Sequence, residues 1–111
     1  MKITVVGAGN AGCMTALHYA WYGRSSDLEI DLIYDPDIKP AAVGQATLLD
    51  PPNILYNATG LTWYNNPIHA TMKSGILYED WGKGGELLHE FPMDKMAMHY
   101  CPWEMQRHIL E

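Results

Sequence analysis

The chain has 111 residues, of which 48% are hydrophobic, and a formal net charge of −6 with only seven Lys and Arg. This length and apolar fraction predict one folded domain. The small number of basic residues argues against nucleic acid as a partner, because phosphate backbones are bound by clusters of Lys and Arg. No apolar run approaches the roughly 20 residues that cross a bilayer, and no secretory leader is recognisable. We therefore expect no membrane association and a cytosolic location.

The residues that usually bind metals do not form a metal-binding pattern. The two cysteines, Cys13 and Cys101, match no ligand spacing, and a reducing cytosol disfavours a disulfide between them. The five histidines show neither an H-x-x-x-H nor an H-E-x-x-H arrangement. We therefore expect no metal site.

The first third of the chain is predicted to form a β-α-β unit. Residues 2–6 are short, apolar and β-branched, which predicts a buried strand. Apolar residues at helical spacing predict a helix over 11–22, with Gly23 just past its end. Alternating residues over 28–34 predict a second strand, which ends before Pro36 because proline lacks a ladder donor. We expect the two strands to be parallel neighbours.

The rest of the chain shows weaker patterns. Residues 38–47 are small and apolar with one glycine, which predicts a loop. Asp50 followed by Pro51 predicts the start of a short helix that ends near Gly60. The other expected features are an irregular stretch over 61–72, a short strand over 76–78, a glycine-rich turn over 81–85 and a final helix over 103–110.

A G-x-G-x-x-G motif, Gly7-Ala8-Gly9-Asn10-Ala11-Gly12, lies between the first predicted strand and the first predicted helix. In dinucleotide-binding folds the first glycine permits the tight turn, the second lets a pyrophosphate approach the backbone and the third lets helix and strand pack closely. The helix N-terminus then presents free N–H groups and a positive dipole end to the anion. This position in the chain makes the motif specific for dinucleotide binding, against the alternative of a glycine-rich turn without a ligand.

An acidic residue usually follows the second strand of a dinucleotide fold, where its carboxylate holds the ribose hydroxyls. Tyr34 stands at the end of the predicted strand and Asp35 follows it, close to the expected separation of about 20 residues from the glycine motif. Asp35 is equally suited to a turn before Pro36, so both roles stay open. No arginine lies next to Asp35, which leaves a 2′-phosphate without an obvious partner.

Three segments of the chain, in order, resemble segments of flavin-dependent tryptophan halogenases. Residues 7–16 resemble the family's G-x-G-x-A-G-W-M-x-A opening. Val43-Gly44-Gln45-Ala46-Thr47 resembles its V-G-E-A-T loop, which wraps the flavin. Residues 70–81 resemble its A-x-[FY]-K-x-x-I-x-F-x-x-W segment, so that Lys73 stands where the family has a catalytic lysine.

The sequence departs from the family pattern at three positions. Cys13 replaces the usual tryptophan, Gln45 replaces the glutamate of the flavin loop, and Tyr34 replaces the acid at the end of the second strand. The family's G-W-x-W-x-I-P motif and its second catalytic carboxylate are not found among these residues, and family members are several times longer.

The resemblance implies an α/β fold, in which residues 1–111 form the N-terminal part of a Rossmann-like FAD-binding domain and the catalytic region starts near 70–81. It implies FAD as the cofactor, reduced by a separate flavin reductase. The residues expected to bind FAD are Gly7, Gly9, Asn10, Ala11, Gly12, Asp35, Val43, Gly44, Gln45 and Ala46.

The implied reaction is halogenation. Hypohalous acid, made from halide and oxygen at the reduced flavin, would pass to Lys73, which would present it to an electron-rich aromatic substrate such as tryptophan or indole. An amine suits this role because it can hydrogen-bond the acid or form a haloamine, and apolar neighbours such as Met72 and Ile76 favour its reactive form.

Two other functions stay open. One is an FAD-dependent monooxygenase or oxidoreductase with a different reaction, and the other is a non-catalytic nucleotide-binding module. Lys73 and the Val43–Thr47 loop favour the halogenase. We expect the 111 residues to be inactive on their own, because the second catalytic carboxylate and the substrate pocket are missing.

Overall fold

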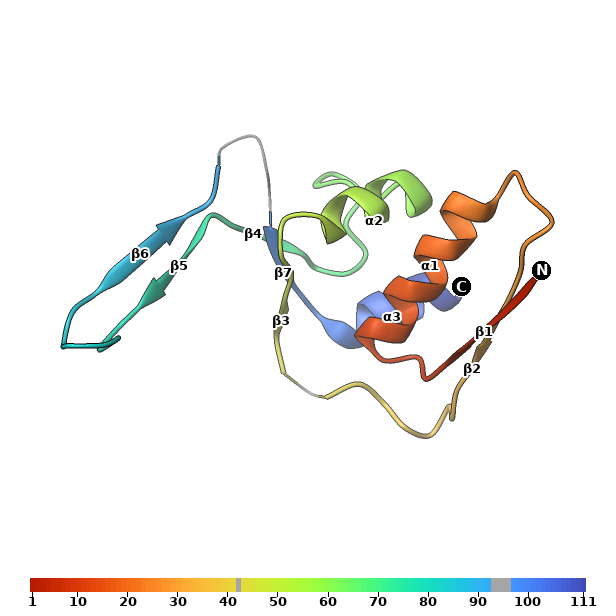
Figure 1. Ribbon diagram of the computed structural model, residues 1–111, viewed down its shortest axis with the longest axis horizontal. Coiled ribbons are helices and arrows are strands. Elements are labelled where there is room, and N and C mark those ends of the chain that lie inside the picture. The colour runs from red at the N-terminus through yellow and green to blue at the C-terminus, as the bar shows by residue number, and fades with distance from the viewer. Residues whose placement is uncertain (42, 93–96) are drawn as a thin grey trace.

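The structure is a computed structural model that describes residues 1–41, 43–92 and 97–111. The described residues form three helices and seven strands (Figure 1). In chain order these are β1 (Lys2–Val6), α1 (Asn10–Gly23), β2 (Glu29–Ile33), β3 (Gln45–Ala46), α2 (Pro51–Thr59), β4 (Thr71–Lys73), β5 (Gly75–Tyr78), β6 (Leu87–Glu90), β7 (Ala97–Tyr100) and α3 (Pro102–Leu110).

The predicted β-α-β unit is confirmed. β1 and β2 pair in parallel along their full lengths, from Lys2 opposite Glu29 to Val6 opposite Ile33, and α1 packs beside them (Figure 1). The Lys2 amine lies 2.8 Å from the Asp31 carboxylate and 3.3 Å from that of Glu29. The hydrogen bond to Asp31, supported by Glu29, raises the pKa of Lys2. These exposed ion pairs link the two strands at their starts.

The end of α1 differs from the prediction. Gly23 is the last residue of the helix rather than the first residue beyond it, and the Arg24 N–H donates to the Trp21 carbonyl at 3.5 Å. This tight last turn keeps a right-handed backbone, so no left-handed glycine is required. A Cβ at position 23 would lie 2.4 Å from the Leu28 side chain, so a larger residue there would require this side chain to move. In contrast, α2 ends before the left-handed Gly60 (φ 70°), as predicted.

β7 is the central strand of a three-stranded antiparallel sheet, with β3 on one side and β4 on the other. His99 of β7 lies opposite Ala46 of β3 and Thr71 of β4. β3 lies within the stretch 38–47, which was predicted to be a loop, and β4 begins within the stretch 61–72, which was predicted to be irregular. β7 was not predicted. Strands of two or three residues are too short to show alternation, and they form here because distant segments pair. Residue 42 lies outside the described residues.

The hydrophobic core joins this sheet to the helices. Its buried members come from α2, the segment before β4, β7 and α3, and side chains of α1 pack against them. Figure 1 shows α1, α2 and α3 gathered around this region. The core residues are Leu55, Leu61, Ile68, Ala70, Met98, Tyr100 and Met105, with Met14, Leu17 and Ile109 packed against them.

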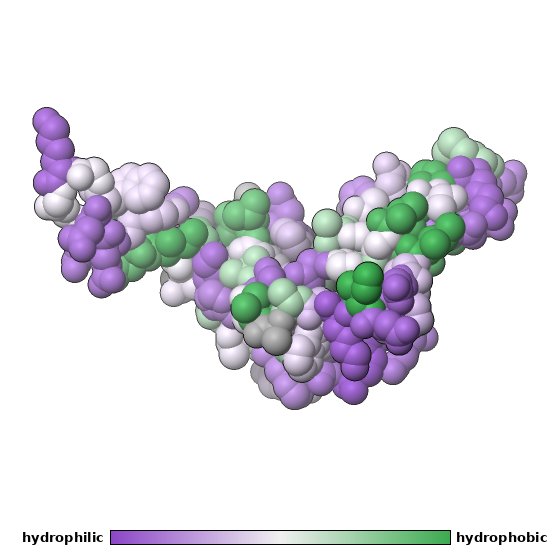
Figure 2. Space-filling model, turned by 90° about the horizontal axis from the view of Figure 1, so that it is seen from below, coloured by the Kyte–Doolittle hydropathy of each residue, from purple (hydrophilic) through white to green (hydrophobic). Residues whose placement is uncertain are grey.

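β5 and β6 form an antiparallel hairpin that projects away from the core (Figure 1). Its turn contains Gly82 and Gly84 in left-handed conformations, which agrees with the glycine-rich turn expected there, whereas β6 was not predicted. All four residues of β6 are exposed, and Figure 2 shows apolar side chains on the surface of this arm. None of the helices in the described ranges has both the length and the apolar character of a membrane span.

Candidate functional site

The glycine motif forms a tight turn between β1 and α1. Gly7 follows β1 directly and adopts φ 98°, a conformation that favours glycine. Its N–H donates to the Ile33 carbonyl at 2.7 Å, which ties the turn to the end of β2. At the other end of the motif, a Cβ on Gly12 would lie 1.7 Å from the Gly7 carbonyl oxygen. The first and third glycines are therefore required by the fold itself.

Gly9 has a different environment from these two glycines. Its backbone is extended (φ −70°, ψ −177°), and a Cβ placed on it would meet nothing within 4 Å. It is the N-cap of α1, where no side chain caps the helix and the first turn contains no acidic residue. An uncapped helix N-terminus beside open space is the arrangement that receives an anion. The geometry therefore fits the pyrophosphate of a dinucleotide.

A hollow of about 180 Å³ adjoins this helix terminus. Its lining includes Gly7, Ala8 and Gly9 of the glycine motif together with Asp35. One Asp35 oxygen accepts the Asp37 N–H at 2.9 Å, so the turn role of Asp35 is present in the structure. Four other lining positions, Ile38, Lys39, Pro40 and Gln106, match no dinucleotide-binding pattern, so sequence reasoning missed them. The lining residues are Gly7, Ala8, Gly9, Tyr34, Asp35, Ile38, Lys39, Pro40 and Gln106.

Asn10 and Ala11 lie in the first turn of α1, next to this hollow but not among its lining residues. The side-chain oxygen of Asn10 is buried and has no hydrogen-bond partner among the described residues. A buried acceptor is normally satisfied by a donor. This orphaned atom lies at the terminus where the fold leaves room for a ligand.

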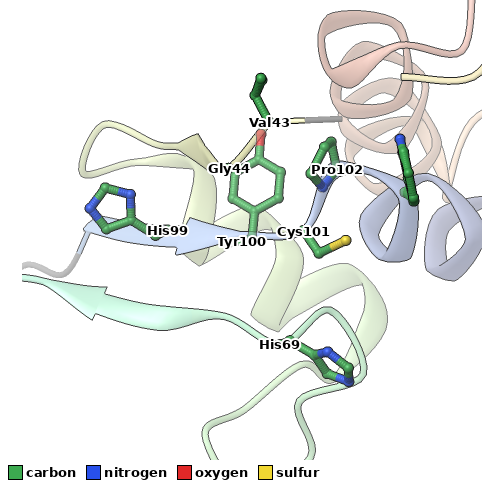
Figure 3. Close-up of a pocket in the computed structure, with 8 residues that line it drawn as sticks. Val43, Gly44, His69, His99, Tyr100, Cys101 and Pro102 are labelled. Atoms are coloured by element: carbon green, nitrogen blue, oxygen red, sulfur yellow. The ribbon is translucent and has the colours of Figure 1, made fainter. Parts of the chain in front are cut away.

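A second hollow, of about 420 Å³, lies between the Val43–Gly44 segment, β7 and the start of α3 (Figure 3). Figure 3 shows His99 and Tyr100 of β7 followed by Cys101, the residue before α3, with His69 on the opposite side from Val43. Burial raises the pKa of the Tyr100 hydroxyl. The lining residues are Val43, Gly44, His69, His99, Tyr100, Cys101, Pro102 and Trp103.

The predicted flavin loop and the predicted catalytic lysine belong to the same sheet. Gln45 and Ala46 form β3, and Lys73 ends β4, on the other side of β7. Two strand spacings separate β3 from β4, which is about 10 Å. Ala46 and Thr71 both lie opposite His99, so these three side chains share one face of the sheet. Lys73 lies on the same face, because it is two residues from Thr71 along β4.

Lys73 is half-buried at the junction between the sheet and the β5–β6 hairpin. Its Nζ atom lies 5.5 Å from the centre of the Phe91 ring, within cation–π range. The Phe91 N–H donates to the Ser74 carbonyl at 2.8 Å, which holds the ring next to the lysine. Lys73 lines neither of the two hollows described above. Within the described stretches, no group of three or more His, Cys, Asp or Glu is placed to hold a metal ion.

Comparisons with known proteins agree with this geometry. The family described as Tryptophan halogenase matches residues 2–109. Among solved structures, BrvH, a flavin-dependent halogenase from Brevundimonas sp. BAL3, superposes on 98% of this chain with a TM-score of 0.70 and 19% identity. Tryptophan 6-halogenase (SttH) from Streptomyces toxytricini superposes on 83% of the chain with a TM-score of 0.63 and 26% identity. No curated protein matches the chain in the sequence comparison.

The chain spans 32% of the BrvH chain and 19% of the SttH chain. Its parallel β-α-β unit and its glycine motif are those of a Rossmann-like domain. Since the family match extends over nearly the whole sequence, the chain belongs to the tryptophan halogenase family.

Proposed function

We propose that this chain supplies the FAD-binding residues and the halogen-transferring lysine of a halogenase that acts on an electron-rich aromatic compound such as tryptophan or indole. The observation that carries the proposal is the hollow at the uncapped N-terminus of α1, in a chain of the tryptophan halogenase family. The names of the two structural relatives, a flavin-dependent halogenase and a tryptophan 6-halogenase, support the same reaction class.

The glycine motif would hold the dinucleotide part of FAD. Gly9 leaves room for the pyrophosphate, and the N–H groups of Asn10, Ala11 and Gly12 belong to the first helical turn, whose dipole favours an anion. Asp35 would accept hydrogen bonds from the ribose hydroxyls with the oxygen that its turn does not use.

The Val43–Ala46 segment would hold the reactive end of the flavin. Val43 and Gly44 line the larger hollow, whereas Gln45 and Ala46 are anchored to β7 by backbone pairing. When bound and reduced by a separate flavin reductase, the cofactor supplies the oxygen chemistry that converts halide into hypohalous acid.

Lys73 would hold and orient the hypohalous acid for attack by the aromatic ring. Its amine can donate a hydrogen bond to the acid, or exchange a proton for the halogen to form a haloamine and water. The sheet register supports a transfer over a short path, since β3 and β4 lie about 10 Å apart across β7. Phe91 restricts the lysine side chain, so that its amine is presented in a limited range of positions.

The proposal is tested with the full-length protein, FAD, a flavin reductase with its reductant, oxygen and either chloride or bromide. Tryptophan and indole are the first substrates, and product is identified by mass spectrometry from the isotope pattern of the halogen. We expect a halogenated product that requires FAD, reductase and halide together. A hydroxylated product without halogen would instead favour a flavin monooxygenase, and a protein that binds no FAD would favour the non-catalytic module.

A further inference from the structure

A residue of α3 makes a direct contact with the glycine motif. The Gln106 side-chain amide Nε2 donates to the Ala8 carbonyl oxygen at 2.6 Å, although the two residues are 98 positions apart. The Cys13 thiol donates to the same oxygen at 3.2 Å. Two donors therefore occupy the two lone pairs of one carbonyl, and Gln106 is the donor that also lines the hollow.

The contact determines the orientation of the peptide between Ala8 and Gly9. In a planar trans peptide the C=O and the N–H point in opposite directions. Because the Ala8 C=O is held toward Gln106 and Cys13, the Gly9 N–H is directed away from these two donors. Gly9 is the N-cap of α1 and lines the hollow, so the contact determines how the Ala8–Gly9 peptide is presented to an anion bound there.

A second side chain of α3 reaches the opposite wall of the same hollow. The Trp103 indole Nε1 donates to the Pro40 carbonyl at 2.6 Å, and Pro40 lines the hollow. Trp103 and Gln106 are three residues apart and therefore lie on one face of the helix. α3 thus bonds both loops that enclose the hollow, the glycine motif and the loop after β2.

We propose that Gln106 is a positioning residue of the cofactor site, which holds the Ala8–Gly9 peptide in the orientation that binds the pyrophosphate of FAD. This role rests on the proposed FAD binding. It adds to the cofactor site a residue of α3, a helix whose sequence contains no cofactor-binding motif. The side chain acts through the backbone of the glycine motif rather than through the reaction itself.

The test compares FAD affinity in full-length Gln106→Leu, Gln106→Glu and Arg107→Ala variants, measured by quenching of flavin fluorescence, together with thermal unfolding of each. Gln106→Leu removes the donor, and we expect about a tenfold weaker affinity with little change in the unfolding temperature. Arg107 is the adjacent control, because its exposed side chain pairs with Glu104 of the same helix and with no other side chain among the described residues. Arg107→Ala should bind FAD like the wild type.

Gln106→Glu separates positioning from packing because its effect depends on pH. At neutral pH the carboxylate only accepts hydrogen bonds and repels the Ala8 oxygen, so FAD should bind more weakly than to Gln106→Leu. As pH falls toward the ordinary glutamate pKa of about 4.3, the protonated carboxyl becomes a donor and the affinity should approach the wild-type value. The ratio of variant to wild-type affinity removes the effect of Tyr34, Asp35 and Lys39, the other titratable side chains that line the hollow.

The outcomes distinguish the role of Gln106 from the proposed function. Wild-type affinity in both Gln106 variants would overturn the positioning role and leave FAD binding intact. A Gln106→Glu to wild-type ratio that stays constant with pH would also overturn it, because a packing defect does not depend on protonation of this carboxyl. Absence of FAD binding by the wild-type protein would overturn the proposed function and the role of Gln106 together.

Discussion

Gly12 packs so tightly against Gly7 that a Cβ atom on Gly12 would lie 1.7 Å from the Gly7 carbonyl oxygen and 2.8 Å from its carbonyl carbon. Real Cβ atoms do not approach backbone atoms this closely, so the start of α1 can pass the turn only if residue 12 has no side chain. Gly9, in the same motif, has nothing within 4 Å of its Cβ position. Gly12 is thus required for folding, whereas the absence of a side chain at Gly9 leaves space that no other residue fills.

Gly12→Ala should therefore destabilise the protein itself. The new methyl group meets backbone atoms that cannot rotate away, and we expect a loss of about 3 kcal/mol or more in the free energy of unfolding. Urea denaturation followed by circular dichroism measures this loss. Gly85→Ala is the matched control, since a Cβ at Gly85 meets nothing within 4 Å and its backbone is not left-handed. Equal stabilities of the two variants would contradict the tight packing at Gly12.

Gly9→Val should leave the fold in place and abolish FAD binding, because its side chain would occupy the space of the pyrophosphate. Gly9→Ser is a gentler companion, because serine is favoured at a helix N-cap and its stability should stay within about 1 kcal/mol of the wild type. Flavin absorbance that copurifies with each variant, followed by FAD titration, measures the effect. FAD bound to Gly9→Val at the wild-type level would rule out the glycine motif as the pyrophosphate site.

The sequence predicted the β-α-β unit well because its signals are local. β-Branched residues, helical spacing and the glycine motif all lie within the first 34 residues, and the parallel pairing followed from them. The sheet formed by β3, β7 and β4 was not predicted, because strands of two to four residues depend on partners far away in the chain.

The candidate site was predictable only where a motif marks it. Gly7 and Gly9 of the motif line one hollow with Asp35, whereas Asn10, Ala11 and Gly12 are not among its lining residues. Gln106 and Lys39 were missed because a single glutamine or lysine carries no signal, and their place beside the motif arises from the tertiary packing of α3 and the loop after β2. Lys73 was predicted as a site residue from its segment alone and stays a prediction, and its contact with Phe91 depends on the path of the hairpin.

Asp35→Asn separates the two roles that the sequence left open for Asp35. Asparagine retains an oxygen that accepts the Asp37 N–H, so the turn and the stability of the protein should be preserved. It removes the charge that strengthens hydrogen bonds from the ribose hydroxyls, and we expect FAD to bind about ten times more weakly. Fluorescence titration and thermal unfolding measure the two effects. Unchanged FAD affinity would leave Asp35 as a turn residue only.

The buried thiol of Cys13 should make the protein less stable at alkaline pH. Burial raises the pKa of Cys13 above its ordinary value of 9.0, so the unfolded chain releases this proton at a lower pH than the folded protein does. The free energy of unfolding should therefore fall as pH rises above 9.0. Tyr100 adds a decrease of the same sign at higher pH, because burial also raises its pKa.

Urea denaturation at several alkaline pH values tests this effect, with Cys13→Ala as the comparison. The variant loses the thiol that donates to Ala8 and will be less stable at every pH, but its free energy of unfolding should decrease less steeply above pH 9.0. Parallel curves for the variant and the wild type would show that Cys13 does not contribute to the pH dependence.

Lys73→Met should abolish halogenation while FAD binding and oxygen consumption stay near wild-type levels. The substitution keeps the length of the side chain, and its thioether can still pack against the Phe91 ring. The strand itself is retained, since the pairing of Lys73 with Ala97 uses only the backbone. What is lost is the amine, so we expect product formation to fall about 100-fold or more.

Lys73→Arg gives a second comparison with the same logic. Its guanidinium keeps a positive charge beside Phe91 but stays protonated, so it cannot serve as a nucleophilic amine, and halogenation should remain low. Mass spectrometry of the product, FAD titration and oxygen uptake are measured on the same samples. Product formation by Lys73→Met at more than a small fraction of the wild-type rate would falsify the catalytic role. Lys73 belongs to β4, and β7 separates this strand from β3, which contains Gln45 and Ala46, so Lys73 should not be needed to hold the cofactor. Loss of FAD binding in Lys73→Met would therefore point to a structural role for Lys73.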